Sequence, residues 1–450
     1  MKFNLLFFTA LFVVLNAAVI PSNKIPSSKP ECSTNASTAY LDIILIIDTS
    51  ANMGSVNLRK ISTTMSLIMP KFTIGNNWDL SQGYRNTRIS VVTYDTNATI
   101  VANFTDINSI GDLNNILNTL TASNSQEANF AFSKAYLAKT GCTSLEHDCA
   151  DPISIRPTAF VVFAAVANSP DLQQIPQLFS DLDFYETGAL ITVNFNTTDQ
   201  TLTNFLQNIT HNYFANASMY NFTASSNTLT KDLEWALLQA NCYCADFFGT
   251  NAIYFDPTNN RYTRYAECMI LGTWEGQGYP NDTIDMCSWS QYQKAIPAFV
   301  LSAEKTNFIQ KVWMGIDPFT GMADYPYYIG LHKNQQGQWT WYDYNKGEFP
   351  LSSYTNWSPG YPNGAAGCAI MDSNDKSTLV WKNYGCNTEE AGVDALLCQV
   401  QACDPSSIAC CLACNAQVGG YNKKKLMKSK GKNRYIRKMK MINGKPVRID

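Results

Sequence analysis

Oxygen-bearing side chains follow the first strongly apolar run of this chain. Residues 41–47 read LDIILII, and Asp48, Ser50 and Asn52 come at alternate positions in the turn that begins there. Carboxylate, hydroxyl and amide oxygens are ligands that a hard cation such as magnesium accepts. Asp48 and Ser50 could instead serve as hydrogen-bonding residues at the start of the following helix. The sequence therefore indicates either a magnesium site or a helix N-terminus.

The histidines of the chain give little support to catalysis. His147, His211 and His332 lie far apart in the sequence, and His147 falls on a polar loop beside Cys149. The sequence holds no G-x-S-x-G, H-E-x-x-H or phosphate-loop motif. We therefore expect a protein that is not an enzyme, and a secreted hydrolase is the last of the alternatives.

Two kinds of segment alternate over the first half of the chain and must position these residues. Short β-branched and apolar runs are typical of central parallel strands. They lie at 41–47, 88–94, 158–167 and 188–195. Segments with helical periodicity lie at 55–72, 110–120, 128–137, 172–179, 202–209 and 229–238. This alternation predicts an α/β doubly wound sheet, in which ligands bind at the carboxyl ends of the strands.

The pattern changes near residue 241. Residues 242–400 are rich in Tyr, Trp, Gly and Cys and contain few long periodic helices. We therefore expect a second domain there, of α+β class and stapled by disulfides. A cluster follows at Cys403, Cys410, Cys411 and Cys414. It is interpreted as disulfides or as a zinc site, and export from the cell would favour disulfides.

Charge is divided unevenly along the chain. The formal net charge is −3, yet residues 421–450 hold twelve Lys or Arg and one acid, a net of +11 that leaves −14 for everything before them. Such a tail is expected to bind anionic surfaces, such as glycosaminoglycans or lipids, or to remain solvated. Nucleic acid is not expected, because the tail offers only Tyr421 and Tyr435 for stacking and because export is expected.

Several features predict a secreted, extracellular protein. Residues 1–18 have the layout of a signal peptide, with one basic residue, about eleven apolar residues and then small residues. No later apolar run approaches the roughly 20 residues of a membrane crossing, so no transmembrane segment is expected. Fourteen cysteines, an even number, suit an oxidising compartment. Nine glycosylation sequons lie at Asn35, Asn97, Asn103, Asn196, Asn208, Asn216, Asn221, Asn281 and Asn356.

Spacing suggests some of the disulfide pairs. Cys142 and Cys149 are close enough for a local bridge. Cys32 precedes the first domain, and Cys242 and Cys244 follow it. Because the ends of a domain often lie close together, we expect Cys32 to pair with one of these two and Cys268 with the other.

Residues 38–240 resemble a von Willebrand factor A domain. That family carries the metal-binding sequence D-x-S-x-S after its first strand. Asp48 and Ser50 match this sequence, while Asn52 stands in place of the last Ser. An amide oxygen can still coordinate a cation, so the resemblance makes magnesium the candidate ion here.

The other two metal-binding segments of that family are altered in this chain. The second loop, at residues 123–129, has no Thr, and Ser125 or Glu127 would have to substitute. The later strand runs into residues 164–167 (AAVA), where the family places an Asp. The resemblance therefore implies a domain that binds protein partners mainly without a metal.

Residues 262–400 resemble a C-type lectin-like domain. The resemblance rests on spaced segments at 298–309 (AFVLSAEKTNFI), 327–331 (YYIGL), 338–341 (QWTW) and 356–357 (NW), and on Cys368, Trp381 and 397–398 (LC). It implies two bridges, Cys287 with Cys398 and Cys368 with Cys386. We expect Trp339, Trp341, Trp357 and Trp381 to be core residues.

The calcium-binding motifs of sugar-binding lectins are altered as well. The first, a Glu/Gln-Pro-Asn/Asp triplet, reads YPN at 361–363, and the second, Trp-Asn-Asp, reads WKN at 381–383. Calcium takes 6–8 oxygen ligands, and a lysine in the motif would repel it. Only Asn363 and Asn383 remain, so the resemblance implies no standard calcium site, although calcium stays a candidate ion. A sugar could instead stack on Tyr361 and form hydrogen bonds with Asn363.

A von Willebrand A-like domain followed by a C-type lectin-like domain resembles secreted proteins that are abundant in nematodes. The resemblance implies extracellular recognition of proteins or glycans, in innate defence or at cuticle and gut surfaces. A structural matrix protein, in which both domains make only protein contacts, is the first alternative.

Overall fold

The computed structural model describes residues 25–76, 85–129, 156–168, 188–212, 215–244, 250–274, 287, 295–313, 325–386, 392–393, 395–406, 436–442 and 445–448. The expected signal peptide, the Cys142 and Cys149 pair, and the expected helix at 172–179 lie outside these residues.

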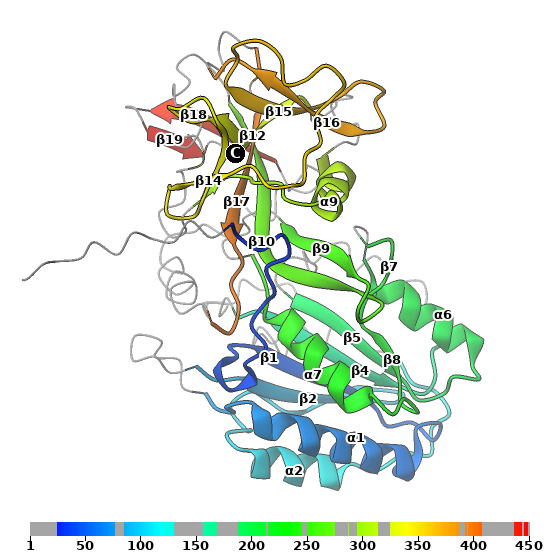
Figure 1. The fold of residues 1–450 in the computed structure, drawn as a ribbon. Coiled ribbons are helices and arrows are strands. Elements are labelled where there is room, and N and C mark those ends of the chain that lie inside the picture. The colour runs from blue at the N-terminus through cyan, green and yellow to red at the C-terminus, as the bar shows by residue number, and fades with distance from the viewer. Residues whose placement is uncertain are drawn as a thin grey trace, which may run out of the picture.

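A six-stranded sheet forms the centre of the first domain, with the strand order β3-β2-β1-β4-β5-β8. All neighbouring pairs are parallel except β2 with β3. The strands are β1 (Asp42–Asp48), β2 (Arg88–Tyr94), β3 (Ala98–Ala102), β4 (Thr158–Ala164), β5 (Gly188–Asn194) and β8 (Asn221–Thr223). A small separate sheet pairs β6 (His211–Asn212) with β7 (Ala217–Ser218). The predicted α/β class is confirmed, and β1 lies inside the sheet (Figure 1).

Helices cover both faces of this sheet (Figure 1). They are α1 (Gly54–Ile68), α2 (Ile110–Thr119), α6 (Gln200–Ile209) and α7 (Leu229–Ala240), with short 3-10 turns at Ala36–Thr38 and Met69–Lys71. Alternation along β1 explains the two layers, because successive strand residues point to opposite faces. Ile43 and Leu45 pack in the cluster with α1, α2 and α7, whereas Ile44 and Ile46 pack in the cluster with α6.

One expected helix of the first domain is only partly described. Of residues 128–137, only 128 and 129 are described, and they are not helical.

The second domain is built on an 11-stranded sheet whose main path is β14-β13-β12-β17-β10-β18-β19. Its strands are β9 (Thr250–Asp256), β10 (Arg261–Trp274), β11 (Ile296–Pro297), β12 (Tyr327–Lys333), β13 (Trp339–Tyr342), β14 (Glu348–Pro350), β15 (Cys368–Ser373), β16 (Leu379–Tyr384), β17 (Ala395–Gln401), β18 (Ile436–Ile442) and β19 (Lys445–Arg448). The helix α9 (Ala303–Trp313) lies beside β9. The sheet extends on both sides of the range 262–400 that the sequence suggested.

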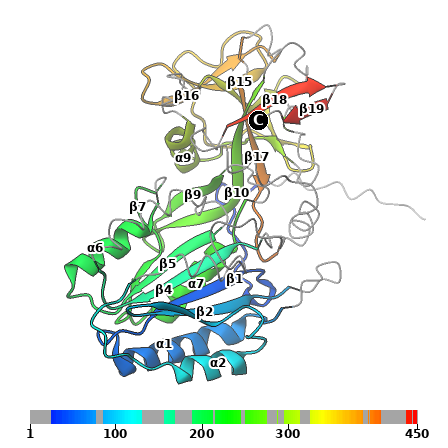
Figure 2. The same cartoon turned by 180° about the vertical axis from the view of Figure 1, so that it is seen from behind.

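The basic tail, which the sequence placed outside both domains, takes part in this sheet. β18 pairs in parallel with the end of β10, from Ile436 opposite Leu271 to Met439 opposite Trp274. It then pairs antiparallel with β19. In both views the β18–β19 hairpin lies on the opposite side of the lectin-like domain from β15 and β16 (Figures 1 and 2).

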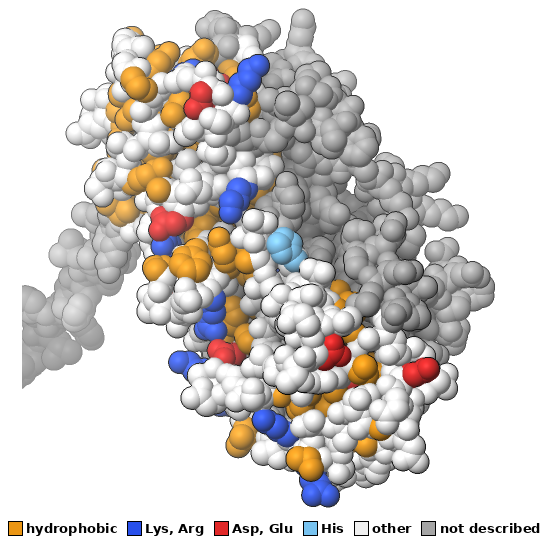
Figure 3. Space-filling model, turned by 90° about the vertical axis from the view of Figure 1, so that its right-hand side faces the viewer, with side chains coloured by type: hydrophobic (Ala, Val, Ile, Leu, Met, Phe, Trp, Pro, Cys, Tyr) orange, Lys and Arg blue, Asp and Glu red, His pale blue; other side chains and the backbone are white. Residues whose placement is uncertain are grey.

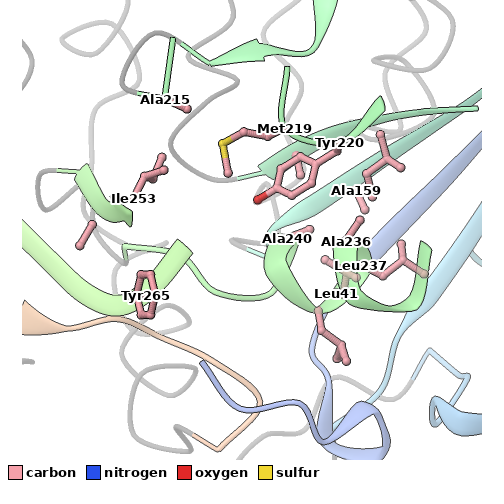
Figure 4. Close-up of a cluster of buried hydrophobic side chains, with 14 of the residues drawn as sticks. Leu41, Ala159, Ala215, Met219, Tyr220, Ala236, Leu237, Ala240, Ile253 and Tyr265 are labelled. Atoms are coloured by element: carbon pink, nitrogen blue, oxygen red, sulfur yellow. The ribbon is translucent and has the colours of Figure 1, made fainter. Parts of the chain in front are cut away.

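A single apolar cluster runs through both domains. It contains Leu41 and Ala159 of the first sheet region, Ala240 of α7, and Ile253 and Tyr265 of β9 and β10. Figure 4 shows this part of the cluster, with side chains from both domains directed into one region. The two domains therefore share a packed interior.

Two disulfides close the junction between the domains. Cys32 is bonded to Cys242 and Cys244 to Cys268, which decides between the two alternatives that the sequence left open. The first bridge ties both ends of the α/β domain together, and the second ties its C-terminal end to β10. Cys403 is also disulfide-bonded. Its neighbours in the cysteine cluster, Cys410, Cys411 and Cys414, lie outside the described residues.

Backbone hydrogen bonds reinforce this junction. The Tyr243 and Cys403 amides each donate to the carbonyl of the other, at 2.9 and 2.8 Å. The Ala266 amide of β10 donates to the Pro30 carbonyl at 2.7 Å, and the Ala402 amide donates to the Ala266 carbonyl at 3.0 Å. Segments from before the first domain, after it, and from β10 and the end of β17 are thus held together.

The expected glycosylation sites differ in their exposure. Asn35, Asn97, Asn103, Asn208 and Asn216 are exposed, Asn196, Asn221 and Asn356 are half-buried, and Asn281 lies outside the described residues. The Asn356 Nδ2 atom, to which a glycan would attach, donates to the Leu379 carbonyl at 2.8 Å. Glycosylation at Asn356 would break this bond.

On the face drawn in Figure 3, charged side chains of the described residues are scattered and of mixed sign.

None of the described helices has the length and the apolar character that a membrane crossing requires.

Candidate functional site

The Asp48 carboxylate lies at the carboxyl end of β1, where α/β sheets bind ligands. It is completely buried. One oxygen accepts the Ser50 amide at 2.7 Å, and the other accepts the Ala165 amide, just past β4, at 2.9 Å. Burial raises the pKa of the Asp48 carboxyl above its ordinary value, against the lowering effect of these amides. Asp48 therefore ties the end of β1 to the end of β4.

The other two residues of this motif have different surroundings. The Ser50 Oγ atom is buried and has no hydrogen-bond partner among the described residues. Asn52 is exposed, and its Nδ2 donates to the Gln126 carbonyl at 2.9 Å. Helix α1 follows with Met53 as its N-cap, without a side-chain cap bond. Neither Asp48 nor Ser50 caps this helix through its side chain.

The second loop lies against the first, as the family resemblance implied. The Ala51 amide donates to the Ser125 carbonyl at 2.7 Å, and the Ser125 hydroxyl lies 2.9 Å from the Thr96 hydroxyl. The Ser125 hydroxyl also accepts the Glu127 amide at 3.1 Å, and the Glu127 carboxylate side chain is exposed at this edge. Ser125 is thus engaged in bonds within the loops.

Three further polar residues, which no motif singled out as site residues, lie at the same edge. Asn168 follows β4, and its Nδ2 donates to the Asn129 Oδ1 at 3.0 Å. The Asn129 Nδ2 in turn donates to the Thr96 carbonyl at 3.0 Å. Thr96 and Asn168 each come just after a predicted strand, so the rule that loops at the carboxyl ends of parallel strands meet could have identified them.

The side-chain oxygens at this edge of the sheet are not arranged as ligands of a magnesium ion. Both Asp48 oxygens accept backbone amides, and one of these belongs to Ala165, in the segment where the resemblance would place a second Asp. Across the parts of the chain that the structure describes, no three His, Cys, Asp or Glu side chains gather as a metal site would need. Amide side chains cross-link the loops here.

In the lectin-like domain, Asn383 forms the centre of a hydrogen-bonded loop. It lies on β16 and is 4% exposed. Its Oδ1 accepts the Asn363 amide at 2.8 Å, while its Nδ2 donates to the Asn363 carbonyl at 2.5 Å and to the Ala366 carbonyl at 3.1 Å. Both halves of the amide group are therefore used inside the protein. Asn383 holds the loop that carries Tyr361 and Asn363.

The neighbouring positions are also occupied by internal contacts. The Lys382 Nζ lies 2.8 Å from Asp372 Oδ2 on the paired strand β15. Tyr361 is half-buried and precedes a cis proline, and the Asn363 side chain is exposed, with one bond of 3.3 Å to the Gly360 carbonyl. A cation that needs several free oxygens does not fit this arrangement.

We expect the substitution Asn383→Ala to destabilise the loop of residues 358–366, which carries Tyr361 and Asn363. Three bonds of a buried side chain are lost, so the free energy of unfolding should fall by about 1–2 kcal/mol. Hydrogen exchange of residues 358–366 should rise in the same variant. Asn363→Ala is the matched control, since its side chain is exposed, and it should change the stability by less than about 0.5 kcal/mol. Equal effects of the two substitutions would contradict the role of Asn383.

Four tryptophans of this domain form one contiguous aromatic group, with their rings edge-on or tilted to one another. Trp341 and Trp381 are completely buried, with ring centroids 5.6 Å apart. Trp357 packs edge-on against Trp381 at 5.6 Å, and Trp339 lies 4.9 Å from Trp357. Trp339 and Trp357 are only half-buried. Two of the four are thus core residues in full, and two lie at the border of the core.

A buried ion pair, which no sequence motif indicated, lies in the same domain. Lys305 of α9 and Glu267 of β10 are each 1% exposed, and the Lys305 Nζ lies 2.9 Å from Glu267 Oε2. The same Nζ donates to Gln399 Oε1 on β17 at 2.9 Å, and the Tyr254 hydroxyl donates to Glu267 at 3.2 Å. Burial lowers the pKa of Lys305, and attraction to Glu267 opposes this.

Two disulfides of this domain are those that the lectin resemblance implied. Cys287 is bonded to Cys398 on β17, and Cys368 on β15 is bonded to Cys386 just after β16. The first links residues 111 apart in sequence and the second residues 18 apart.

Family comparisons agree with this fold. The von Willebrand factor type A domain matches residues 42–146, and the Lectin C-type domain matches residues 286–394. The chain therefore combines a von Willebrand factor A domain with a C-type lectin domain, which confirms both resemblances. Neither match indicates a catalytic family.

One curated relative shares most of this chain. C-type lectin domain-containing protein 160 of Caenorhabditis elegans is 24% identical over 389 residues, which cover 83% of this chain and 55% of that protein. The chain thus spans about half the length of that relative.

Comparison with solved structures gives partial likenesses with TM-scores below 0.5. Proximal thread matrix protein 1 of the mussel byssus, with a zinc-occupied MIDAS motif, is 17% identical, with a TM-score of 0.35 over 45% of this chain and 46% of that chain. The SpRpn10 VWA domain is 14% identical, with a TM-score of 0.29 over 43% of this chain and 94% of that chain.

Proposed function

We propose that this chain is a secreted recognition protein that binds protein or glycan partners without a divalent cation. The observation that carries the proposal is the Asn383 amide, which spends its oxygen and its nitrogen on Asn363 and Ala366. Lys382, which pairs with Asp372, and Asn383 stand at the sequence positions of the calcium motif of sugar-binding lectins, and both use their polar groups inside the protein. Recognition then depends on side chains alone.

The surface offered to a glycan is the loop that Asn383 supports. Tyr361 presents an aromatic side chain and Asn363 an exposed amide. An aromatic face beside a hydrogen-bonding group is a common way to bind a sugar without metal, because the ring packs on the apolar face of the sugar. We assign Tyr361 and Asn363 as the contact residues.

The A domain supplies a second binding surface, which also requires no metal ion. At the carboxyl edge of its sheet, the amides of Asn52, Asn129 and Asn168 and the hydroxyl of Thr96 hold the loops together. Loops that are already cross-linked lose little conformational entropy on binding. This edge, with the exposed Glu127 carboxylate, is suited to a protein partner.

The junction between the domains holds the two binding surfaces in a fixed arrangement. Two disulfides and the shared core leave no flexible linker between the domains among the described residues. Secretion, glycosylation and a role in innate defence belong to this proposal. The bridges and the domain families support an extracellular location, because disulfides persist in oxidising compartments.

Binding with and without a chelator tests the proposal. The purified chain is applied to a glycan array, a panel of matrix proteins and intact microbial cells, once with calcium and magnesium and once with EDTA. We expect the same bound partners in both conditions, and a loss of glycan binding of about tenfold for Tyr361→Ala, since the aromatic contact with the sugar is removed. Tyr384→Ala, at an exposed tyrosine at the end of β16, is the matched control and should leave glycan binding unchanged.

The outcomes separate the alternatives. Binding that EDTA abolishes and calcium restores would overturn the metal-free proposal. Binding to matrix proteins alone would assign the chain to structural adhesion.

A further inference from the structure

The C-terminal hairpin places cations at the margin of the lectin sheet. β18 and β19 together hold Arg437, Lys438, Lys440, Lys445 and Arg448, with no acidic residue. Paired strands hold these positions in a fixed register, so the hairpin is a structured part of the domain. Nothing in the recognition surfaces described above uses it.

Register assigns the cations to the two faces of the hairpin. Residues directly opposite one another, such as Lys440 and Val447 or Ile442 and Lys445, share a face, and alternate residues along a strand do likewise. By this register, positions 438, 440 and 445 belong to one face of the hairpin, and positions 437 and 448 belong to the other. Alternate positions along a strand repeat about every 7 Å.

Protection of a sheet edge explains only part of this charge. Edge strands are often guarded by lysine, proline and short length, and β19 has four residues with Lys445 and Pro446. β18, however, is paired with β10 on one side and with β19 on the other, and it carries three of the five cations. A strand that is paired on both sides has no free edge to protect from pairing with another chain. The basic residues of β18 therefore need another explanation.

The residue types of the hairpin indicate which kind of ligand it can bind. The described residues of the hairpin include no Phe, Tyr or Trp, so they offer neither a stacking surface for nucleobases nor the aromatic anchors typical of membrane interfaces. The sequence before residue 421 has a net charge of −14 and would repel a polyanion elsewhere. A ligand with repeated anionic groups, recognised through charge at regular spacing, matches the hairpin.

We infer that the β18–β19 hairpin binds a sulfated polysaccharide. The site lies on the opposite side of the lectin-like domain from β15 and β16 (Figures 1 and 2). It is therefore separate from the loop of Tyr361, and both ligands can be bound at once.

Heparin serves as the probe, with the full chain immobilised for surface plasmon resonance. The variant Lys438→Gln/Lys440→Gln/Lys445→Gln should bind heparin about tenfold more weakly, since each exposed ion pair is worth up to about 1 kcal/mol. The control Lys423→Gln/Lys424→Gln/Lys425→Gln removes the same charge from the same tail, and we expect less than about a threefold loss. Lys438→Arg/Lys440→Arg/Lys445→Arg should retain binding.

A measurement on the unaltered chain keeps the test independent of variant folding. Heparin should slow hydrogen exchange within residues 436–448. Protection confined to residues 421–435, or equal losses in the Gln variant and its control, would overturn the inference in favour of bulk charge. Vesicles containing phosphatidylserine are the second arm. Hairpin-dependent binding to vesicles at a salt concentration that releases heparin would assign the hairpin to membranes and also overturn it.

Discussion

Replacing both cysteines of the Cys32 and Cys242 bridge by serine is expected to lower the free energy of unfolding of the A domain by about 5 kcal/mol. The bridge joins residues 210 apart in sequence and encloses the whole A domain. In the chain-entropy description, a cross-link that closes so long a loop removes much of the freedom of the unfolded chain. Chemical unfolding followed by circular dichroism, compared with the unaltered chain, measures the loss.

The short bridge of the lectin domain is the matched control. Cys368→Ser/Cys386→Ser opens a link between residues only 18 apart, so the loss should be about 3 kcal/mol and should appear in the lectin transition. The reverse order of the two losses would contradict an entropic origin. A Cys32→Ser/Cys242→Ser variant that leaves the A domain transition unchanged would show that the shared core alone holds the domain ends.

Replacing Lys305 by methionine is expected to destabilise the lectin domain by about 3–5 kcal/mol. The substitution keeps an unbranched, slightly shorter side chain but leaves the Glu267 carboxylate buried without its charge partner. The Tyr254 hydroxyl still donates to Glu267 Oε2, whereas Oε1 has no hydrogen bond among the described residues, so the buried charge is poorly compensated. Denaturant unfolding of the variant at neutral pH gives the value.

The double variant separates the charge from the packing. Lys305→Met/Glu267→Gln removes both charges, and it should recover most of the loss, because a buried pair replaced as a whole is often close to neutral in stability. Losses that simply add would mean that the two side chains act independently. In that case Gln399, which also accepts from Lys305, would be the more important partner.

Much of the fold follows from local patterns. The run at residues 41–47 and the other apolar runs predicted β1, β2, β4 and β5 to within three residues at each end, because a central parallel strand is buried on both faces and is mostly apolar. The hairpin at 436–448 was not predicted, because its many basic residues are typical of a solvated tail. Its strand character depends on pairing with β10, which lies more than 160 residues earlier.

The candidate sites were less accessible from sequence. Asp48 and Asn383 were singled out by position, but their roles depend on what lies opposite. Asp48 accepts the amide of Ala165, and Asn383 bonds to the Asn363 backbone, contacts over 117 and 20 residues. Hydrogen-bond partners so far apart are set by how strands and loops meet in space, which periodicity does not report.

The sequence by itself determined the two domain types, their order and the residue types at each motif, since these depend on composition, spacing and strand or helix period. Only the tertiary structure decided that Cys32 pairs with Cys242 and not with Cys244, that the domains share one core, and that the basic tail supplies two strands. The physical reason is that pairing and burial depend on distances between remote segments, and these exist only once the chain has folded.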